Sequence, residues 1–352
     1  MKKFKVGMVG VGRATSYGHI FVNHPDTEVV ALCDMNPEIL AKNGEDFKLD
    51  EKNLYLNYED LLNSDVDIVV LGTPIPFHAE QTIKAMEAGK HVLCEVTASD
   101  NIADCQRMVD AVRKSKTKFM MAENCNYMDF AIEWDGWIKS GKIGTPFYAE
   151  ADYLHEIRGL VDGKWRANRA PLHYCSHSLG PILMWMDDHI VRCTASGNHH
   201  SIEPATTGNI DIQVALFETA KGATIKLSRS SVALREPALC HYNIIGTKGF
   251  LESSRQGYAG VGLRHFADHD EERQGMPIAI NITDLNAPKE ATAGGHGSSE
   301  YYLVRDFLKS IENDTTPPID IVRAMDMTVP GLIAHEAAMK GGVWLDVPRL
   351  TD

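Results

Sequence analysis

The chain has 352 residues, a length that suits two domains better than one. Its 35 Lys and Arg residues stand against 48 Asp and Glu residues, which gives a net charge of −13. This acidic balance argues against nucleic acid or an anionic membrane as a partner and favours a neutral small molecule. Seven scattered cysteines without a Cys-x-x-Cys pair, and no apolar stretch of about 20 residues, indicate a cytoplasmic protein with reduced thiols.

The first segment predicts a buried parallel strand that runs into a glycine turn. Val6–Val9 is apolar, and Gly10 and Gly12 follow it directly. Glycines at these positions let the backbone approach a dinucleotide pyrophosphate, which binds at the N-terminus of the next helix. Arg13 opens that helix, and we expect it to contact the cofactor. The third position of the fingerprint is Thr15 rather than glycine or alanine, so the turn alone is a weak signal.

A second apolar strand, Val29–Asp34, ends in an acidic residue. Asp34 follows Gly12 by 22 residues, the spacing expected for a carboxylate that binds the ribose hydroxyls. Such a carboxylate accepts from the 2′-hydroxyl and repels a 2′-phosphate, so we expect NAD rather than NADP. The alternative is an aspartate that only forms a turn after the strand.

Strands and helices continue to alternate through residue 122. Strands are predicted at Asp67–Thr73, His91–Glu95 and Lys118–Ala122, and helices at Glu80–Ala88 and Asn101–Lys114. This pattern predicts an α/β N-terminal Rossmann domain, a doubly wound parallel sheet over residues 1–122. The cofactor is then expected at the carboxyl ends of the strands.

From residue 123 the pattern changes to a helix followed by several strands. The helix is expected at Phe130–Ile138, and the strands at Pro146–Tyr153, Ile190–Ala195, Asn209–Phe217, Ala223–Ser230 and His241–Gly246. Residues 123–352 are therefore predicted to form an α+β C-terminal domain with a largely antiparallel sheet, for substrate binding and for a homo-oligomer, a dimer or a tetramer.

Two later segments complete the prediction. Gly257–Ser299 is rich in Gly, Asp, His and Pro, and we expect a long functional loop there. Ile319–Met339 is expected to be helical, with an interruption near Pro330-Gly331, and to pack back on the first domain.

Two strand ends carry a family pattern. Thr73-Pro74-Ile75-Pro76-Phe77-His78 and Gly89-Lys90-His91-Val92-Leu93-Cys94-Glu95 resemble the Thr-Pro-x-x-x-His and Gly-Lys-His-Val-x-x-Glu-Lys-Pro segments of the Gfo/Idh/MocA family, the relatives of glucose–fructose oxidoreductase and inositol dehydrogenase. The resemblance implies NAD as cofactor, with Thr73, Pro74, His78 and Glu95 on the cofactor side. Val96 stands where that family usually has a catalytic or substrate-orienting lysine.

Other segments resemble one branch of this family, the NAD-dependent glycoside hydrolases of the α-N-acetylgalactosaminidase type. The similar segments are Glu123–Tyr127, Trp165-Arg166, Leu172–Pro181 and Gly294–Gly297. The resemblance implies a cofactor-side role for Asn124. We expect Glu123, His155, Trp165, Arg166 and His173 to bind substrate hydroxyls, with Trp165 also able to stack on a sugar face. Little else matches after Ser201, so the substrate's identity does not carry over.

Tyr174 and His177 are the predicted reacting groups. If this segment is helical, they lie three residues apart on one face. Removing a hydride from a sugar carbinol requires a base for the hydroxyl proton, which an imidazole or a phenol can supply. His296, between glycines that allow close approach to a ligand, is a third catalytic candidate. The alternative is that all three are structural residues, and for His296 it weighs equally.

We expect no metal site. His173 and His177 have the spacing of a helical metal pair but lack the glutamate of His-Glu-x-x-His, so a metal remains a minor alternative.

Three functions remain open. The resemblance implies redox-neutral glycoside cleavage, in which oxidation at the sugar's C3 acidifies C2 and expels the C1 aglycone before hydration and re-reduction. The second function is a net dehydrogenase that releases a keto-sugar or a keto-inositol. The third is a non-catalytic NAD-binding sensor.

Overall fold

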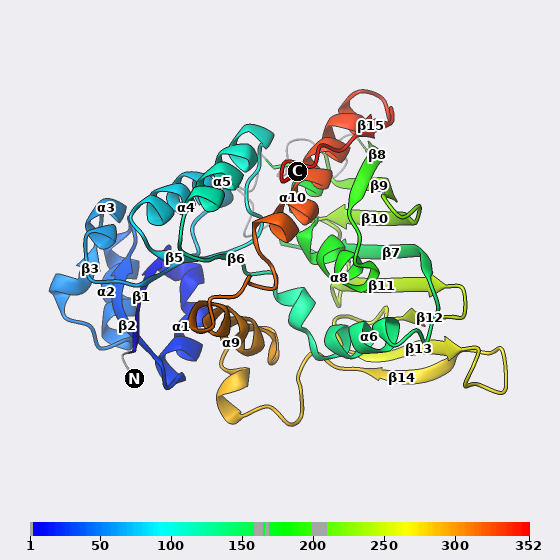
Figure 1. Cartoon of the computed structure of the whole chain (residues 1–352), viewed down its shortest axis with the longest axis horizontal. Coiled ribbons are helices and arrows are strands. Elements are labelled where there is room, and N and C mark those ends of the chain that lie inside the picture. Colours follow the sequence, from blue (N-terminus) through cyan, green and yellow to red (C-terminus); the bar gives the residue numbers. More distant parts are fainter. Residues whose placement is uncertain (1–2, 158–164, 166–168, 199–209) are drawn as a thin grey trace. The chain divides into compact units, whose positions relative to one another are not determined.

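A computed structural model of the chain describes residues 3–157, 165, 169–198 and 210–352 (Figure 1). The chain divides into two units, each with its own core. The first unit comprises Met1–Asn124, Leu285–Met325 and Leu350–Asp352, and the second comprises Cys125–Asp284 and Asp326–Arg349. Residues 285–325 were expected in the second domain, and the structure groups them with the first unit.

The first unit is built on a parallel sheet with the strand order β3-β2-β1-β4-β5-β6. The strands are β1 (Phe4–Val9), β2 (Thr27–Cys33), β3 (Leu54–Tyr55), β4 (Ile68–Leu71), β5 (His91–Cys94) and β6 (Phe119–Met121). The order reverses between β1 and β4, which pair in parallel with Val6 opposite Ile68. Such a switch point opens a crevice at the carboxyl ends of the strands, where α/β proteins bind their ligands.

Helices cover both faces of this sheet. They are α1 (Val11–Asn23), α2 (Pro37–Asp46), α3 (Tyr58–Leu62), α4 (His78–Glu87), α5 (Ile102–Lys114) and α9 (Ser299–Glu312), with short 3₁₀ turns η1 (Glu51–Asn53), η2 (Ile75–Phe77) and η6 (Lys289–Thr292). Figure 1 shows α4 and α5 on one face, and α1 with α9 on the other.

Local signals explain where two of these helices begin. The Asn36 side chain accepts from the backbone N–H groups of Glu38 and Ile39 at the start of α2. The Asn101 side chain accepts from Asp104 N at 2.9 Å at the start of α5. These side-chain acceptors satisfy N–H groups that the helix itself leaves without a partner.

The second unit contains a mixed, mostly antiparallel sheet with the order β14-β13-β12-β11-β7-β10-β9-β8-β15. The strands are β7 (Pro146–Leu154), β8 (Ile190–Gly197), β9 (Ile212–Thr219), β10 (Thr224–Ser230), β11 (Leu239–Gly246), β12 (Gly249–Glu252), β13 (Gly260–Phe266), β14 (Met276–Ile280) and β15 (Leu345–Asp346). Only β7 and β10 pair in parallel among the described strands of this sheet. The predicted fold class is confirmed for both units.

One face of this sheet carries helices. They are α6 (Asp129–Lys139) and α8 (Ser176–Met186), preceded by the 3₁₀ turns η3 (Asn124–Tyr127) and η5 (Pro171–Tyr174). Helix α8 packs on β7 and β11 and also contacts α6. Its residues are almost all buried, and His177 near its start lies next to Tyr153 near the end of β7.

Two predicted elements were wrong. The segment expected as one long loop, Gly257–Ser299, contains the antiparallel pair β13–β14, because Val261 and Leu263 lie opposite Ala279 and Pro277 at the sheet edge. Gly260 and Gly262 in β13 and Pro277 in β14 are residue types that are depleted in strands, so the local pattern favoured a loop.

The second error concerns the helix near the C-terminus. It was expected to break near Pro330, but α10 (Ile321–Met339) runs through that proline. A proline removes one hydrogen bond, and packing can offset that loss: a Cβ on the next residue, Gly331, would come within 2.2 Å of Leu172 O. This close approach shows how tightly the helix is packed beyond the proline.

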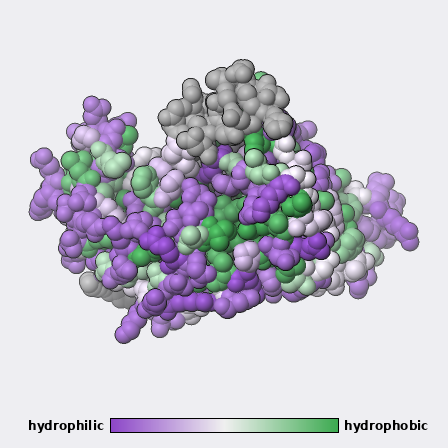
Figure 2. Space-filling model, turned by 90° about the horizontal axis from the view of Figure 1, so that it is seen from above, coloured by the Kyte–Doolittle hydropathy of each residue, from purple (hydrophilic) through white to green (hydrophobic). Residues whose placement is uncertain are grey.

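On the face seen in Figure 2, hydrophilic side chains surround smaller hydrophobic areas. This distribution fits the chain's 24% charged residues and net charge of −13. Among the helices that the structure describes, none has the length and apolar character needed to cross a membrane.

Candidate functional site

The glycine turn after β1 has the geometry of a dinucleotide-binding turn. Gly10 has φ of +73°, and a Cβ there would lie 2.7 Å from Thr73 N at the end of β4. At Gly12, by contrast, a Cβ would meet no atom of the described residues within 4 Å, apart from the neighbouring backbone of its own helix. The turn is therefore closed toward β4 and open above the N-terminus of α1, where a pyrophosphate binds in this type of fold.

Asp34, directly after β2, faces this turn. Its Oδ2 accepts from Val11 N at 3.0 Å, and its Oδ1 accepts from Asn36 N at 2.9 Å. Asp34 lines a cavity of about 360 Å³, together with Gly10, Thr73 and Pro74. A carboxylate, a glycine turn and a helix N-terminus around one cavity are the groups that an adenine dinucleotide requires, so the first unit fits NAD.

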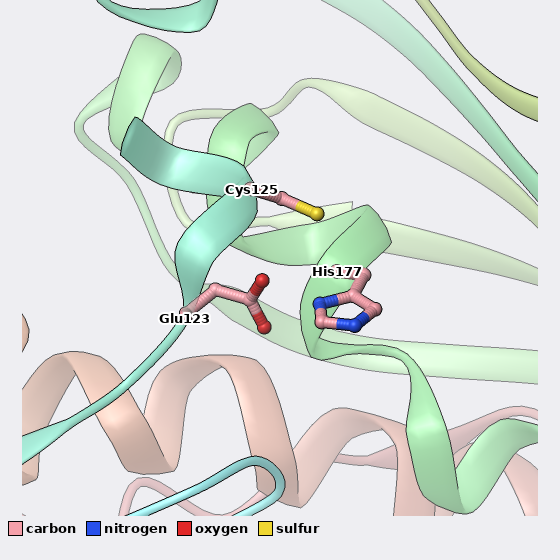
Figure 3. Close-up of side chains that lie close together, drawn as sticks. All are labelled: Glu123, Cys125 and His177. Atoms are coloured by element: carbon pink, nitrogen blue, oxygen red, sulfur yellow. The ribbon is translucent and has the colours of Figure 1, made fainter. Parts of the chain in front are cut away.

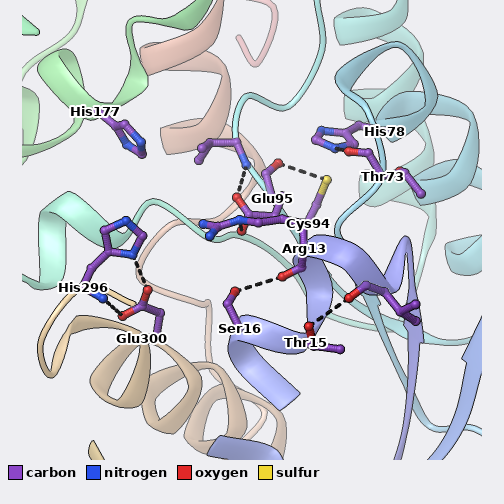
Figure 4. A network of polar contacts seen from close by, with 12 residues as sticks. Arg13, Thr15, Ser16, Thr73, His78, Cys94, Glu95, His177, His296 and Glu300 are labelled. Carbon is purple, nitrogen blue, oxygen red and sulfur yellow. Dashed lines mark hydrogen bonds and ion pairs between the residues drawn. The ribbon is translucent and has the colours of Figure 1, made fainter. Parts of the chain in front are cut away.

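Arg13 and Glu95 form an ion pair in the first unit. Arg13 Nε lies 2.6 Å from Glu95 Oε1, and Glu95 is buried while Arg13 is partly exposed (Figure 4). Beside them, burial and the charge of Glu95 raise the pKa of Tyr17 well above its usual value. The pair links the first turn of α1 to the end of β5, and it places a buried charge at the predicted cofactor side.

His78 is fully buried, and both its ring nitrogens face backbone carbonyls. Nδ1 lies 2.7 Å from Thr97 O and Nε2 lies 2.8 Å from Thr73 O. The imidazole therefore connects the segments after β4 and β5 and holds Thr73 in place. Its predicted direct contact with the cofactor stays a prediction.

His296 is oriented by a carboxylate that the sequence analysis did not select. His296 Nδ1 lies 2.5 Å from Glu300 Oε1, in the first turn of α9 (Figure 4). Glu300 also accepts from His296 N at 3.3 Å and from Ser299 Oγ at 3.0 Å. Because Nδ1 donates to Glu300, Nε2 is the ring nitrogen left for a ligand.

The Glu300 carboxylate also explains why a glycine stands at position 294, in the segment Gly294–Gly297. A Cβ at Gly294 would lie 2.9 Å from Glu300 Cδ, so the Glu300 side chain occupies that space. An acidic residue four positions after a histidine between glycines was the available sequence signal for Glu300.

Burial opposes ionisation of Glu300, but the hydrogen bond and charge of His296 outweigh it and hold the pKa of Glu300 below its usual value. The ionised carboxylate therefore stabilises the fold above the unfolded pKa of about 4.3, and this contribution is lost as the pH falls through the folded pKa. We expect Glu300→Gln to lower the free energy of unfolding by about 1–3 kcal/mol at neutral pH. As the pH falls below about 4.3 the difference from the native protein should shrink, because the unfolded chain binds a proton at Glu300 before the folded protein does.

Urea midpoints at neutral pH and at a pH below about 4.3 test this expectation, and Glu312→Gln is the control because Glu312 is an exposed residue of the same helix. An equal loss at both pH values would show that the charge of Glu300 does not stabilise the fold.

The second unit brings Tyr174 and His177 together, as predicted, though not on one helix. Tyr174 ends η5, and His177 lies in the first turn of α8. The Tyr174 hydroxyl is 3.1 Å from His177 Nε2, and the two rings meet edge-on with centroids 5.0 Å apart. A phenol and an imidazole in hydrogen-bond contact can pass a proton between them.

Side chains from β7, from β10 and from the segment between β12 and β13 surround the Tyr174–His177 pair. The Tyr153 ring lies edge-on to His177 with centroids 5.3 Å apart, and the Tyr258 hydroxyl donates to the Tyr153 hydroxyl at 2.8 Å. The Arg229 guanidinium lies 4.8 Å from the Tyr153 ring centroid and is fully buried. Every second residue of β10 faces the same side of the sheet, and these residues are Ile225, Leu227 and Arg229. An arginine on the buried, apolar face of a predicted strand was the sequence signal that the prediction missed.

His155 is part of this cluster, but as a neutral acceptor. Burial, together with the charges of Arg229 and His177, lowers the pKa of His155 to about 3. Its Nε2 accepts from Arg229 Nη2 at 3.2 Å. This nitrogen is therefore occupied, and a contact of His155 with substrate would use Nδ1.

His173 lies apart from the reacting pair. Its ring packs edge-on against His335 with centroids 4.8 Å apart, and burial lowers its pKa to about 3.

The other predicted substrate and cofactor residues are placed as follows. The ring centroid of Trp165 lies 5.0 Å from the Arg169 guanidinium carbon. Arg166 lies outside the described residues. Glu123 and Asn124 are buried, and they are the last two residues of the first unit's segment Met1–Asn124.

Cys125 and His177 of the second unit lie close together (Figure 3). The thiol sulfur and an imidazole nitrogen lie within 4.8 Å. Together with Glu123 they are residue types that bind metal ions. His177 Nε2 also meets the Tyr174 hydroxyl, and we assign no metal to this group.

Two family models match the chain. One, described as the oxidoreductase family with an NAD-binding Rossmann fold, covers residues 4–123. The other, the Gfo/Idh/MocA C-terminal domain, covers residues 135–252. The chain belongs to the Gfo/Idh/MocA family. Its cofactor is NAD, which agrees with the glycine turn and Asp34.

Curated relatives of this Gfo/Idh/MocA protein carry glycosidase names. It is 25% identical to a glycosyl hydrolase family 109 protein of Shewanella pealeana, across 100% of this chain and 86% of the relative. It is 24% identical to an alpha-N-acetylgalactosaminidase of Shewanella oneidensis, with the same coverage. The predicted resemblance to this branch is confirmed.

Solved structures share the whole fold. A levoglucosan dehydrogenase in complex with NADH and L-sorbose superposes with a TM-score of 0.85 at 20% identity, covering 99% of this chain and 100% of the other. An oxidoreductase domain protein from Kribbella flavida gives 0.84 at 18% identity, with the same coverage.

Proposed function

We propose that this protein is an NAD-dependent enzyme that cleaves glycosides without net oxidation. The observation that carries the proposal is the hydrogen-bonded Tyr174–His177 pair, 3.1 Å apart, in a chain with an NAD-binding unit. The glycosidase names of relatives aligned along the whole chain support the substrate class. Val96, in place of the lysine of the wider family, means that another group serves as base.

When bound, NAD accepts a hydride from the sugar's C3 and later returns it. The chain's own residues move the protons. Tyr174 and His177 take the C3 hydroxyl proton as the ketone forms, and they return it when the ketone is reduced. A hydrogen bond from the protonated pair to the ketone oxygen then holds the oxidised sugar.

The C3 ketone makes the C2 proton acidic, so a base can remove it and expel the aglycone from C1. His296 is our candidate for this second proton transfer, since Glu300 fixes its Nδ1 and leaves Nε2 for substrate. Water then adds at C1 while C2 regains a proton. The aglycone leaves as an alcohol or a phenol, and the sugar ends in its original oxidation state, so no pair of flanking carboxylates is needed.

The test is incubation of the purified protein with NAD and a panel of nitrophenyl glycosides, following nitrophenol and NADH absorbance together. We expect nitrophenol release without a matching rise in NADH. NADH that accumulates with a free sugar or an intact glycoside, without nitrophenol, would instead establish a net dehydrogenase and overturn the cleavage proposal. Turnover of either kind would exclude a non-catalytic sensor.

A further inference from the structure

Two guanidinium groups lie against the ring of Tyr174. The Cζ atom of Arg169, directly before η5, is 4.6 Å from the Tyr174 ring centroid. The Cζ atom of Arg229, on β10, is 5.4 Å from the same centroid. Both distances are within the range of a cation–π contact. Tyr174 is thus the described residue on which both cations of this cluster converge.

Arg229 brings a buried charge that its hydrogen bonds do not neutralise. In the part of the chain that the structure describes, the Arg229 side chain donates only to neutral acceptors. These are Tyr174 O at 3.2 Å, Tyr153 O at 3.3 Å, His155 Nε2 at 3.2 Å, and Ser230 O. Burial lowers the pKa of Arg229, but an arginine remains charged at physiological pH. A positive charge without a hydrogen-bonded carboxylate stabilises any anion that forms beside it.

Three described titratable side chains near Tyr174 add no negative charge to oppose this field. His155 and His173 are neutral at pH 7, because burial is the main cause that lowers both pKa values to about 3. Tyr153 is also neutral, since burial raises its pKa far above the usual value despite the opposing charge of Arg229. His177 Nε2, at 3.1 Å, shares a proton with the Tyr174 hydroxyl.

We propose that Arg169 and Arg229 are positioning residues that stabilise the phenolate of Tyr174, so that Tyr174 is the group that accepts the sugar's hydroxyl proton. This assignment rests on the proposed function. In that step the hydroxyl O–H bond breaks and its proton passes to the phenolate oxygen. The carbinol C–H bond breaks with its electron pair, and the hydride goes to the bound NAD. His177 donates its Nε2–H to the phenolate oxygen before transfer.

The experiment measures ionisation of Tyr174 directly, without relying on turnover. The ultraviolet absorbance of tyrosinate is followed against pH in the full-length protein and in Tyr174→Phe, and the difference between the two titrations isolates Tyr174. The same pair of titrations is made in the Arg169→Met and Arg229→Met backgrounds. Arg305→Met is the matched control, since Arg305 lies 4.6 Å from the ring of Tyr302 in the first unit.

Removal of either arginine should move the Tyr174 titration to higher pH by about one unit or more, because an opposite charge at this range favours ionisation by that amount. Arg229→Lys should keep most of the native midpoint, since it retains the charge. Arg305→Met should leave the Tyr174 midpoint unchanged. If Arg229→Met does not fold, Arg169 decides the question, because its side chain is only partly buried.

A Tyr174 midpoint that stays the same in both methionine variants would overturn the assignment. The acid limb of the pH–rate profile gives a second readout and should move upward with the titration. An unchanged limb, with a shifted titration, would show that Tyr174 is not the proton acceptor. Because the titration needs no substrate, failure of the glycosidase proposal and failure of this inference give separate results.

Discussion

Tyr174→Phe is expected to lower kcat by about 10²–10⁴-fold, the usual contribution of a positioned acid–base group. The change removes the hydroxyl that meets His177 Nε2 at 3.1 Å and keeps the ring that Arg169 and Arg229 contact. The fold should therefore be retained. NAD affinity should also be unchanged, because the glycine turn and Asp34 belong to the first unit.

The measurement is the initial rate of nitrophenol release, paired with NAD titration by calorimetry. His177→Gln should give a loss of similar size, and the double variant should lose little more, because the two groups act as one unit. His269→Gln, an exposed histidine in the turn after β13, is the control and should retain full activity. Native turnover in Tyr174→Phe would remove this residue from the mechanism.

Gly10→Ala is expected to destabilise the protein by about 2–5 kcal/mol before any ligand binds. The backbone at Gly10 has φ of +73°, which disfavours any side chain with a Cβ. The added methyl would also lie 2.7 Å from Thr73 N and 2.8 Å from Gly72 C, and neither backbone atom can move without shifting the end of β4. Thermal unfolding without NAD measures this effect.

Gly12→Ala is the matched variant, and it should separate folding from binding. Among the described residues, no atom outside the neighbouring backbone of α1 lies within 4 Å of a Cβ at Gly12, so the unfolding free energy without NAD should change by less than about 1 kcal/mol. NAD affinity should fall, since the methyl occupies the space through which the pyrophosphate approaches the backbone. Unchanged NAD affinity in Gly12→Ala would mean that the pyrophosphate binds elsewhere. An unchanged unfolding free energy in Gly10→Ala would show that the backbone after β4 can move to accommodate the methyl group.

Parts of this protein could be predicted from short segments. The strand, the glycines and the acidic residue of the first unit lie within residues 4–34, and their spacing alone predicts a dinucleotide turn with Asp34 as its acidic residue. The structure then places Asp34 Oδ2 3.0 Å from Val11 N, next to that turn. Tyr174 and His177 were selected in the same way, as near neighbours in the chain. Both predictions depend on contacts between residues that are close in sequence, where few conformations are possible.

The groups that complete the second-unit cluster could not be found in this way. Arg229 is 55 residues from Tyr174, and it reaches Tyr174 O only because β10 pairs with β7 in parallel, which no local pattern predicts. The sheet-edge pair β13–β14 was missed for a related reason, since its strands are defined by pairing, and Gly260, Gly262 and Pro277 weaken their local strand signal.

The sequence by itself determined the alternation of strands and helices, the dinucleotide turn and the choice of NAD, because periodicity and spacing act over a few residues. Only the tertiary structure decided that a buried, permanently charged arginine lies against Tyr174, that Glu300 orients His296, and that His173 turns away toward His335. These features depend on strand pairing and packing, which bring distant residues together and bury their charges.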